Sequence, residues 1–316
     1  MPLAPIVSFA SRFAWSSATV VALLVASALG TAPIGCSPRN AASPTIEPQA
    51  VTFAKAAPKI GRVTIVESSI ALTLQTDAQA EGRGPTRLST SVIERERRRE
   101  EVLAVFDRIV TKKRVTFEQL EKQESQGEDP GSVQPSMLAG RTYVAEVKQS
   151  VPIFTDAKGS PVSDDEAREL TRRLASLGKP DPFLEGIPEG PVYPGRSASG
   201  VASGFLEIFE GADPGEHGRP DGPDVGNVDV HFAGARDSAQ GKCGVFAVSL
   251  GIQLAGEPRL AMDLNGEFVV RVADSAPIAL DVRGPVRITG VQTVEGVNVR
   301  LTGSGRIRGG FQVTYL

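Results

Sequence analysis

The stretch LAGRTYVAEVKQSVPIFTDAKGSPVSDDEARELTRRLASLG, residues 138–178, decides the fold because strand, turn and helix signals follow one another in it. Tyr143, Ala145 and Val147 recur at every second position, which is the pattern of a half-buried strand. A second extended segment begins at Ile153, and the Asp-Ala-Lys-Gly after it favours a reverse turn. The stretch therefore predicts two strands followed by a helix.

A helix is predicted for residues 164–177, with clear start and stop signals. Ser163 and Glu166 have the spacing of a capping box, in which each side chain accepts a hydrogen bond from the other residue's amide. Gly178 suits the left-handed conformation that ends many helices. The pattern favours an ordinary helix packed on a sheet, with a lid over a sheet cavity as the alternative. Its apolar stripe consists of Ala167, Leu170, Leu174 and Leu177.

Strand patterns fill the last third of the chain, residues 228–316. One apolar face per strand is typical of antiparallel sheets whose other face is solvated or covered differently. The predicted fold is mainly β, with antiparallel sheets arranged as a sandwich or an open half-barrel and one capped amphipathic helix packed on the sheet. The alternating segments begin at Val228, Phe246, Leu260, Phe268, Ile278, Val297 and Phe311.

The N-terminal segment has the features of a secretory signal. Arg12 precedes an apolar run over residues 13–29, which is short for a membrane span. The following Ile34-Gly35-Cys36 resembles the lipobox of bacterial lipoproteins, although Pro33 departs from its usual Leu-like residue. The resemblance implies that Cys36 is lipidated and becomes the mature N-terminus, followed by a polar tether. Simple secretion, with cleavage after Ala28 or Ala32, is the alternative.

The sequence divides at changes of composition. We expect a signal peptide (1–35), a flexible tether (36–49), a β-rich half (50–210) that includes the helix 164–177, a Gly/Pro/acidic loop (211–227) and an antiparallel β half (228–316). Within these parts, residues 94–101 (ERERRREE) predict a solvated face. Residues 102–120 fit either a helix or a hairpin around Asp107-Arg108, and the β-branched content favours the hairpin.

Other segments are expected to lack regular structure or to form short elements. Residues 125–136 and the Pro-rich residues 179–197 are predicted to be loops, and a short helix is predicted near residues 201–209. Asp213, Glu216, His217, Asp221 and Asp224 offer oxygen and nitrogen ligands, but they lack the spacing of a calcium loop, so a surface loop is favoured there.

The chemistry of known enzyme motifs is not evident. Residues 234–243 resemble a phosphate-binding loop but have the wrong spacing, and Ser176-Leu177-Gly178-Lys179 closes a helix where the S-x-x-K motif opens one. His231 lies inside a strand, opposite to Val230 and Phe232, and is interpreted as structural. We therefore predict no catalytic residues, no metal and no cofactor.

The net charge and the two thiols bear on possible partners and on disulfide formation. The chain of 316 residues has two cysteines and a net charge of −3, which gives no reason to expect a nucleic-acid partner. Cys243 begins an apolar strand, so it is either a buried free thiol or, in a protein that is only secreted, the partner of Cys36 in a disulfide.

The layout as a whole resembles uncharacterised envelope lipoproteins of Gram-negative bacteria. More loosely, its architecture is similar to that of periplasmic lipid carriers with an open half-barrel. These resemblances imply an exported protein, anchored by lipid to the envelope, with the outer membrane as the expected membrane. We expect a non-enzymatic module that binds a lipid, a peptide or an envelope protein. An envelope hydrolase with acidic catalysts is the alternative.

Overall fold

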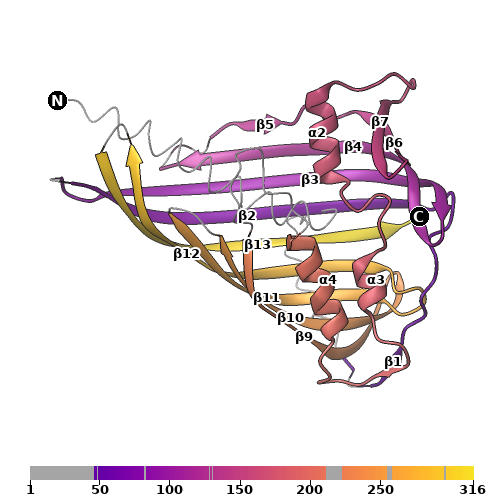
Figure 1. Ribbon diagram of the computed structural model, residues 1–316. Coiled ribbons are helices and arrows are strands. Elements are labelled where there is room, and N and C mark those ends of the chain that lie inside the picture. The colour runs from indigo at the N-terminus through magenta and orange to yellow at the C-terminus, as the bar shows by residue number, and fades with distance from the viewer. Residues whose placement is uncertain are drawn as a thin grey trace.

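The computed structural model describes residues 46–47, 49–81, 83–127, 129, 131–210, 223–254, 258–294 and 297–316. Its main feature is one antiparallel sheet of eleven strands that stays open, so the predicted mainly β fold is confirmed. Figure 1 shows a long, twisted sheet with the helices on one face. The strand order is β7-β6-β4-β3-β2-β13-β12-β11-β10-β9, with β5 paired to β4, and the short β1 and β8 pair separately.

The strands are long and follow one another mostly as hairpins. Their bounds are β1 (Val51–Thr52), β2 (Val63–Ala80), β3 (Thr86–Phe106), β4 (Ile109–Gln126), β5 (Val133–Pro135), β6 (Thr142–Lys148), β7 (Val151–Asp156), β8 (Pro191–Val192), β9 (Pro223–Ser238), β10 (Gly241–Leu254), β11 (Arg259–Arg271), β12 (Pro277–Val294) and β13 (Val297–Tyr315). The last strand, β13, pairs with β2 from Tyr315–Thr64 to Val299–Ala80, so the sheet is continuous between the two ends of the described chain.

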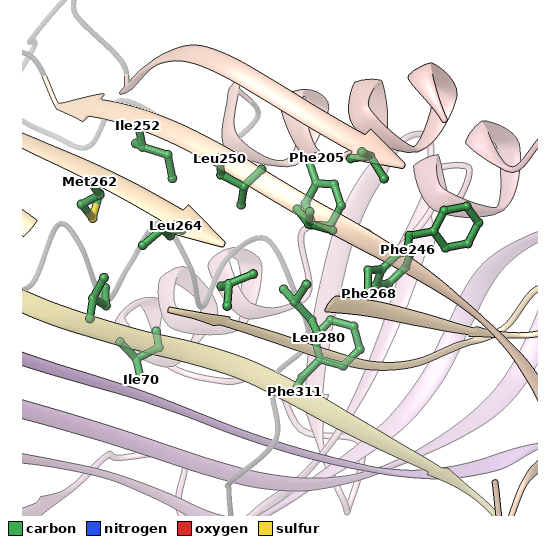
Figure 2. Packing of buried hydrophobic residues seen from close by; sticks show 14 of the residues in the cluster. Ile70, Phe205, Phe246, Leu250, Ile252, Met262, Leu264, Phe268, Leu280 and Phe311 are labelled. Carbon is green, nitrogen blue, oxygen red and sulfur yellow. The ribbon is translucent and has the colours of Figure 1, made fainter. Parts of the chain in front are cut away.

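The main core lies between this sheet and the helices α3 (Pro182–Gly186) and α4 (Ser199–Glu210). Phe183 of α3 and Phe205 of α4 meet at a centroid distance of 4.8 Å, and both rings contact Phe268 of β11. Figure 2 shows the apolar side chains that five strands and α4 direct into this core. The residues labelled there are Ile70, Phe205, Phe246, Leu250, Ile252, Met262, Leu264, Phe268, Leu280 and Phe311.

A second core lies under α2 (Asp164–Arg173), which packs on the sheet near β4, β6 and β7. Three residues of the predicted stripe are buried there, namely Leu170, Leu174 and Leu177. They pack with Val115, Phe117, Leu120, Leu138, Tyr143, Ala145 and Phe154. The two cores are separated by β3, whose inner face is charged, as described below.

The start of α2 has the geometry of a capping box. The Ser163 Oγ accepts from the Glu166 amide at 3.3 Å, and the Glu166 carboxylate accepts from the Ser163 amide at 3.1 Å. Tyr143 and Arg141 also donate to Glu166, so the cap is tied to β6. These hydrogen bonds, from Tyr143 first and Ser163 second, lower the pKa of Glu166 to about 2.

The end of α2 differs from the prediction. The helix ends at Arg173 rather than at residue 177, with Leu174 as its C-cap. The chain then turns down onto the sheet, where the Gly178 amide donates to the carbonyl of Val110 at 3.0 Å. Gly178 has a φ of +78°, and a Cβ there would lie 2.6 Å from a methyl group of Val147. Its role is therefore close packing against β6, four residues beyond the C-cap.

Other expectations are confirmed or corrected by the strand and helix bounds. The hairpin around Asp107-Arg108 and the helix near residues 201–209 are confirmed, as the β3–β4 pairing and α4 show. The predicted loop at residues 125–136 is partly wrong, because β4 continues to Gln126 and β5 lies within it. The predicted loop at 211–227 ends too late, because β9 begins at Pro223; its residues 211–222 lie outside the described chain.

The Pro-rich connection also contains regular structure that was not predicted. Asp181 caps α3, since its Oδ1 accepts from the amides of Phe183 and Leu184 at 3.0 and 3.2 Å. Pro182 is tolerated because the first turn of a helix needs no amide donor from that position. The expectation of a structureless connection was therefore wrong over residues 182–186 and at β8, Pro191–Val192, which pairs with β1.

We predict that α2 is a packed element of the fold rather than a separately opening lid. Ser163→Ala should lower the free energy of unfolding by about 1 kcal/mol, the usual cost of losing a cap. Leu174→Ala should lower it by roughly 2–5 kcal/mol, because a cavity adds to the lost transfer free energy. Urea denaturation measures both effects, and Ser176→Ala, at an exposed site beyond the helix, is the control. Amide exchange in α2 much faster than in β10 would contradict the prediction.

Candidate functional site

The charged run at residues 94–101 lies inside β3, and half of it is buried. Because side chains alternate between the faces of a strand, the even-numbered residues share the face toward α2. Glu96 and Arg98 on this face are only 1% and 4% exposed. The expectation of a solvated face was therefore wrong for the even-numbered half of the run.

Ion pairs join this face of β3 to β4 and α2 in one continuous series. Arg98 contacts Glu96 at 2.7 Å and Glu100 at 2.5 Å, and Lys113 of β4 contacts Glu100 at 3.0 Å. Arg173 of α2 then contacts Glu96 at 2.5 Å. We call this set the charge cluster; with its outer members it consists of Glu94, Glu96, Arg98, Glu100, Lys113, Glu169, Arg172 and Arg173.

The odd-numbered residues of the run behave as the sequence predicts. Arg95 pairs with Glu121 at 3.3 Å, and Arg97 pairs with Glu118 at 2.6 Å, all four being partly exposed. Pairs of this kind contribute little to stability because water screens them. The alternation of the strand therefore divides one charged run into a buried ion-pair series and an ordinary solvated surface.

The charge cluster contains four carboxylates and four cations, so it carries no net formal charge. Burial by itself raises the pKa of Glu100, but the attraction of Lys113 and Arg98 outweighs it and lowers that pKa to about 2. Burial is likewise outweighed at Arg173, whose pKa is raised by Glu96 and Glu169. At Lys113, burial prevails and lowers the pKa. The carboxylate of Glu100 is thus held in its ionised form.

A cavity of about 320 Å³ opens beside the charge cluster, between the sheet and the α2–α3 connection. Its floor includes the cross-strand pairs Val66–Val313 and Thr64–Tyr315 of β2 and β13. Further apolar lining comes from Val102, Val110, Leu177, Phe183 and Phe311, and Arg98, Glu100 and Lys113 form its charged inner wall. The cavity therefore combines an apolar floor with an inner wall whose charges are already paired.

Basic residues predominate at the rest of the cavity lining. The cations there are Arg62, Arg108 and Lys179, and the carboxylates are Asp181 and Glu207. Asp181 already caps α3 through its carboxylate. Arg108 and Lys179 are exposed and form no ion pair within the described part of the chain. The lining outside the charge cluster thus offers positive charge that is in direct contact with no carboxylate of the described residues.

Arg62 is the most distinctive of these cations. Its guanidinium lies over the ring of Tyr315, 5.3 Å from the centroid, while Arg271 occupies a second position 4.2 Å from that centroid. Its Nε is buried and has no hydrogen-bond partner among the described residues. The guanidinium forms no ion pair among the described residues, so its charge at the cavity border is not matched by a contacting carboxylate there.

The candidate thiols and histidines of the sequence analysis lie away from this cavity or outside the described chain, whereas Ser176, Leu177 and Lys179 of the S-x-x-K segment line it. Cys36 and His217 lie outside the described chain. Cys243 is a buried free thiol in β10, but its pairing with Cys36 is untested because the latter is not described. His231 is half exposed and pairs with Asp229 at 2.7 Å. Among the described residues, no group of three His, Cys, Asp or Glu side chains could hold a metal ion.

Sequence reasoning missed the charge cluster and the cavity. A strand was predicted directly after the charged run, from residue 102, and an eight-residue run that continues such a strand places alternate charges on the inner face. Arg173 at the end of the predicted helix offered the matching charge. No local pattern, however, indicates that Arg62 and Tyr315, at opposite ends of the described chain, meet across β2 and β13.

Comparisons with known proteins give little guidance. No family model and no curated protein matches this sequence. Among solved structures, one of lipovitellin concerned with lipid–protein interactions has 7% identity and a TM-score of 0.31, covering 80% of this chain and 26% of its own. This chain thus spans about a quarter of lipovitellin.

Two further structures are less similar. DynF, from the dynemicin biosynthesis pathway of Micromonospora chersina, has 10% identity and a TM-score of 0.15, covering 88% of this chain and 93% of its own. A LolA superfamily protein from Nitrosomonas europaea has 10% identity and a TM-score of 0.13, covering 75% and 84%. TM-scores this low assign neither fold nor function.

We predict that acid destabilises the protein partly through Glu100. Its folded-state pKa of about 2 lies below the ordinary 4.5, so its contribution is complete above pH 4.5 and is lost as the pH falls toward 2. The difference corresponds to about 3 kcal/mol. The free energy of unfolding of Glu100→Gln, measured in urea, should therefore be lower than that of the wild type above pH 4.5. It should also fall less than that of the wild type on acidification.

The neighbouring Glu101 supplies the control for this measurement. Glu101 pairs with Arg114 on the opposite, partly exposed face of β3. Glu101→Gln should change the free energy of unfolding by at most about 1 kcal/mol, the range of exposed pairs. A Glu100→Gln variant that keeps the full acid sensitivity of the wild type would show that the charge cluster is not its source.

Proposed function

We propose that the protein binds a small amphipathic anion, such as a single-chain fatty acid or lysolipid, in the cavity between its sheet and the α2–α3 connection. The observation that carries this proposal is an apolar cavity floor bordered by Arg62, Arg108 and Lys179, which form no ion pair with the described residues. The anionic group would be bound by Arg62 and Lys179. The chain would lie along Val66 and Val313.

The size of the cavity supports a ligand with one chain. Small-molecule sites range over about 300–1,000 Å³ and are mostly apolar, with a few placed polar groups that fix orientation. At about 320 Å³ this cavity is near the lower end of that range. A two-chain phospholipid would leave much of its hydrocarbon outside.

The hydrolase alternative finds less support in the same region. A general acid requires a carboxyl group that holds a proton near the working pH. Glu100, the carboxylate of the charge cluster that lines the cavity, is held ionised by Lys113 and Arg98, as its pKa of about 2 indicates. Burial raises the pKa of Asp181, which also lines the cavity, but its Oδ1 already accepts the two amide hydrogen bonds that cap α3. The His231–Asp229 pair lies on strand β9 and does not line the cavity. We therefore propose binding rather than catalysis.

Ligand titration tests the proposal. Delipidated protein should bind dodecanoate at least tenfold more tightly than dodecanol, because the alcohol has the same chain without the charge. Arg62→Gln should weaken dodecanoate binding about tenfold, the loss of a charged hydrogen bond, and leave dodecanol binding unchanged. Displacement of a fluorescent fatty-acid analogue provides the measurement.

Two further variants make this test specific to the cavity. Val66→Phe narrows the floor and should weaken both ligands. Arg287→Gln, at an exposed arginine paired with Asp263 in β11, should change neither. Wild-type affinity in both Val66→Phe and Arg62→Gln would place any binding elsewhere and reject the proposed site.

We also propose that the protein is exported and anchored in the cell envelope through acyl groups on Cys36. The support is the apolar leader that ends at Ile34-Gly35-Cys36 and the polar residues after it. Among the described residues, no helix is long and apolar enough to cross a membrane. Intact-mass analysis of protein from the native envelope should show a chain that begins at acylated Cys36. An unmodified N-terminus at Leu29 or Pro33 would contradict this.

A further inference from the structure

Two neighbouring hairpin turns carry exposed apolar side chains at one end of the sheet. The β3–β4 turn is flanked by Phe106, which is 75% exposed, and the β6–β7 turn by Val151, which is 59% exposed. Both hairpins have left-handed residues at the two central positions, as type I′ hairpin turns require. Lys112 pairs with Glu146, so β4 and β6 are adjacent and their turns project side by side.

A third exposed apolar residue lies next to them. The Gly61 amide donates to the carbonyl of Val102 at 2.8 Å, which places Ile60 beside the end of β3, toward Phe106. Ile60 is 68% exposed. Large apolar side chains this exposed are costly to solvate, and their grouping on one edge is typical of an interaction surface.

Basic residues surround these apolar ones. Lys59, Arg108 and Lys148 are exposed at the same end of the sheet. The acidic residues nearby are Asp107, within the turn, and Glu146, which already pairs with Lys112 at 3.2 Å and Lys148 at 3.5 Å. Positive charge is thus in excess around the exposed apolar side chains. We call this surface the rim; it consists of Ile60, Phe106, Val151, Lys59, Arg108 and Lys148.

We propose that the rim docks onto an anionic lipid bilayer, with Ile60, Phe106 and Val151 entering the interface and Lys59, Arg108 and Lys148 contacting lipid phosphates. Apolar insertion and attraction to anionic lipid act together in such surfaces. Arg108 belongs to both the rim and the cavity lining. Docking therefore brings the cavity to the membrane surface, where an amphipathic ligand would reside. Delivery of a ligand to the cavity rests on the proposed function, but the docking of the rim onto a bilayer does not.

Fluorescence of a reporter tryptophan in the full chain tests the rim. Trp15, the only native tryptophan, is first replaced by phenylalanine. Phe106→Trp should then show a blue shift and strong quenching by brominated lipids in vesicles of phosphatidylcholine with phosphatidylglycerol. Val291→Trp, at an exposed apolar site at the other end of the sheet, is the matched control and should show neither. Equal quenching at the two positions, or none at Phe106→Trp, would overturn the proposal.

The charges of the rim supply a second measurement. Adding Lys59→Glu and Lys148→Glu, which do not line the cavity, to the Phe106→Trp chain should lower the partition coefficient into the anionic vesicles at least tenfold, since attraction to anionic lipid weakens with each surface cation that is lost. Unchanged partitioning would also overturn the proposal. Titration of the wild-type chain with dodecanoate, without vesicles, distinguishes rim docking from ligand binding in the cavity. If only rim docking is wrong, the affinity for dodecanoate is retained. If only ligand binding is wrong, the Phe106→Trp chain still shows quenching by brominated lipids.

Discussion

The ion-pair series on the inner face of β3 is the constraint on which the arrangement of the molecule depends. Burying charge is unfavourable unless every charge has a partner with good geometry. Here Arg98 and Arg173 each contact two or more carboxylates, and the sum of formal charges is zero. Such a set stabilises one relative position of β3, β4 and α2, because any other position leaves a buried charge unpaired.

This constraint also explains why a cavity exists at this point of the sheet. Arg173 fixes the end of α2 over β3, so the chain must leave the helix at Leu174 and cross toward α3 above β2 and β13. Gly178 brings the connection down onto the carbonyl of Val110. The cavity lies between this connection and the sheet, beside the charged side chains of β3 and β4.

The sequence allowed the prediction of what depends on local periodicity and of little else. Alternation predicted the strands of the last third, and the Ser163–Glu166 spacing indicated the start of α2, because both are set by neighbours along the chain. The charged run at 94–101 was misinterpreted because its burial depends on Arg173, which is distant in sequence. The pairing of β2 with β13 likewise joins residues that are distant in sequence. The cavity whose floor these strands form could therefore not be predicted.

The paired inner wall and the unmatched cations at the border of the cavity together determine how a ligand would be oriented. An anionic group placed beside Arg98 and Lys113 would compete with Glu100 and leave that carboxylate buried without a partner. The same group beside Arg62 would instead meet a guanidinium that forms no ion pair among the described residues. The cavity therefore selects one ligand orientation, because an anionic group is disfavoured beside Glu100 and favoured beside Arg62. That difference favours a bound anion whose charge stays with Arg62 and whose chain lies against Val66 and Val313.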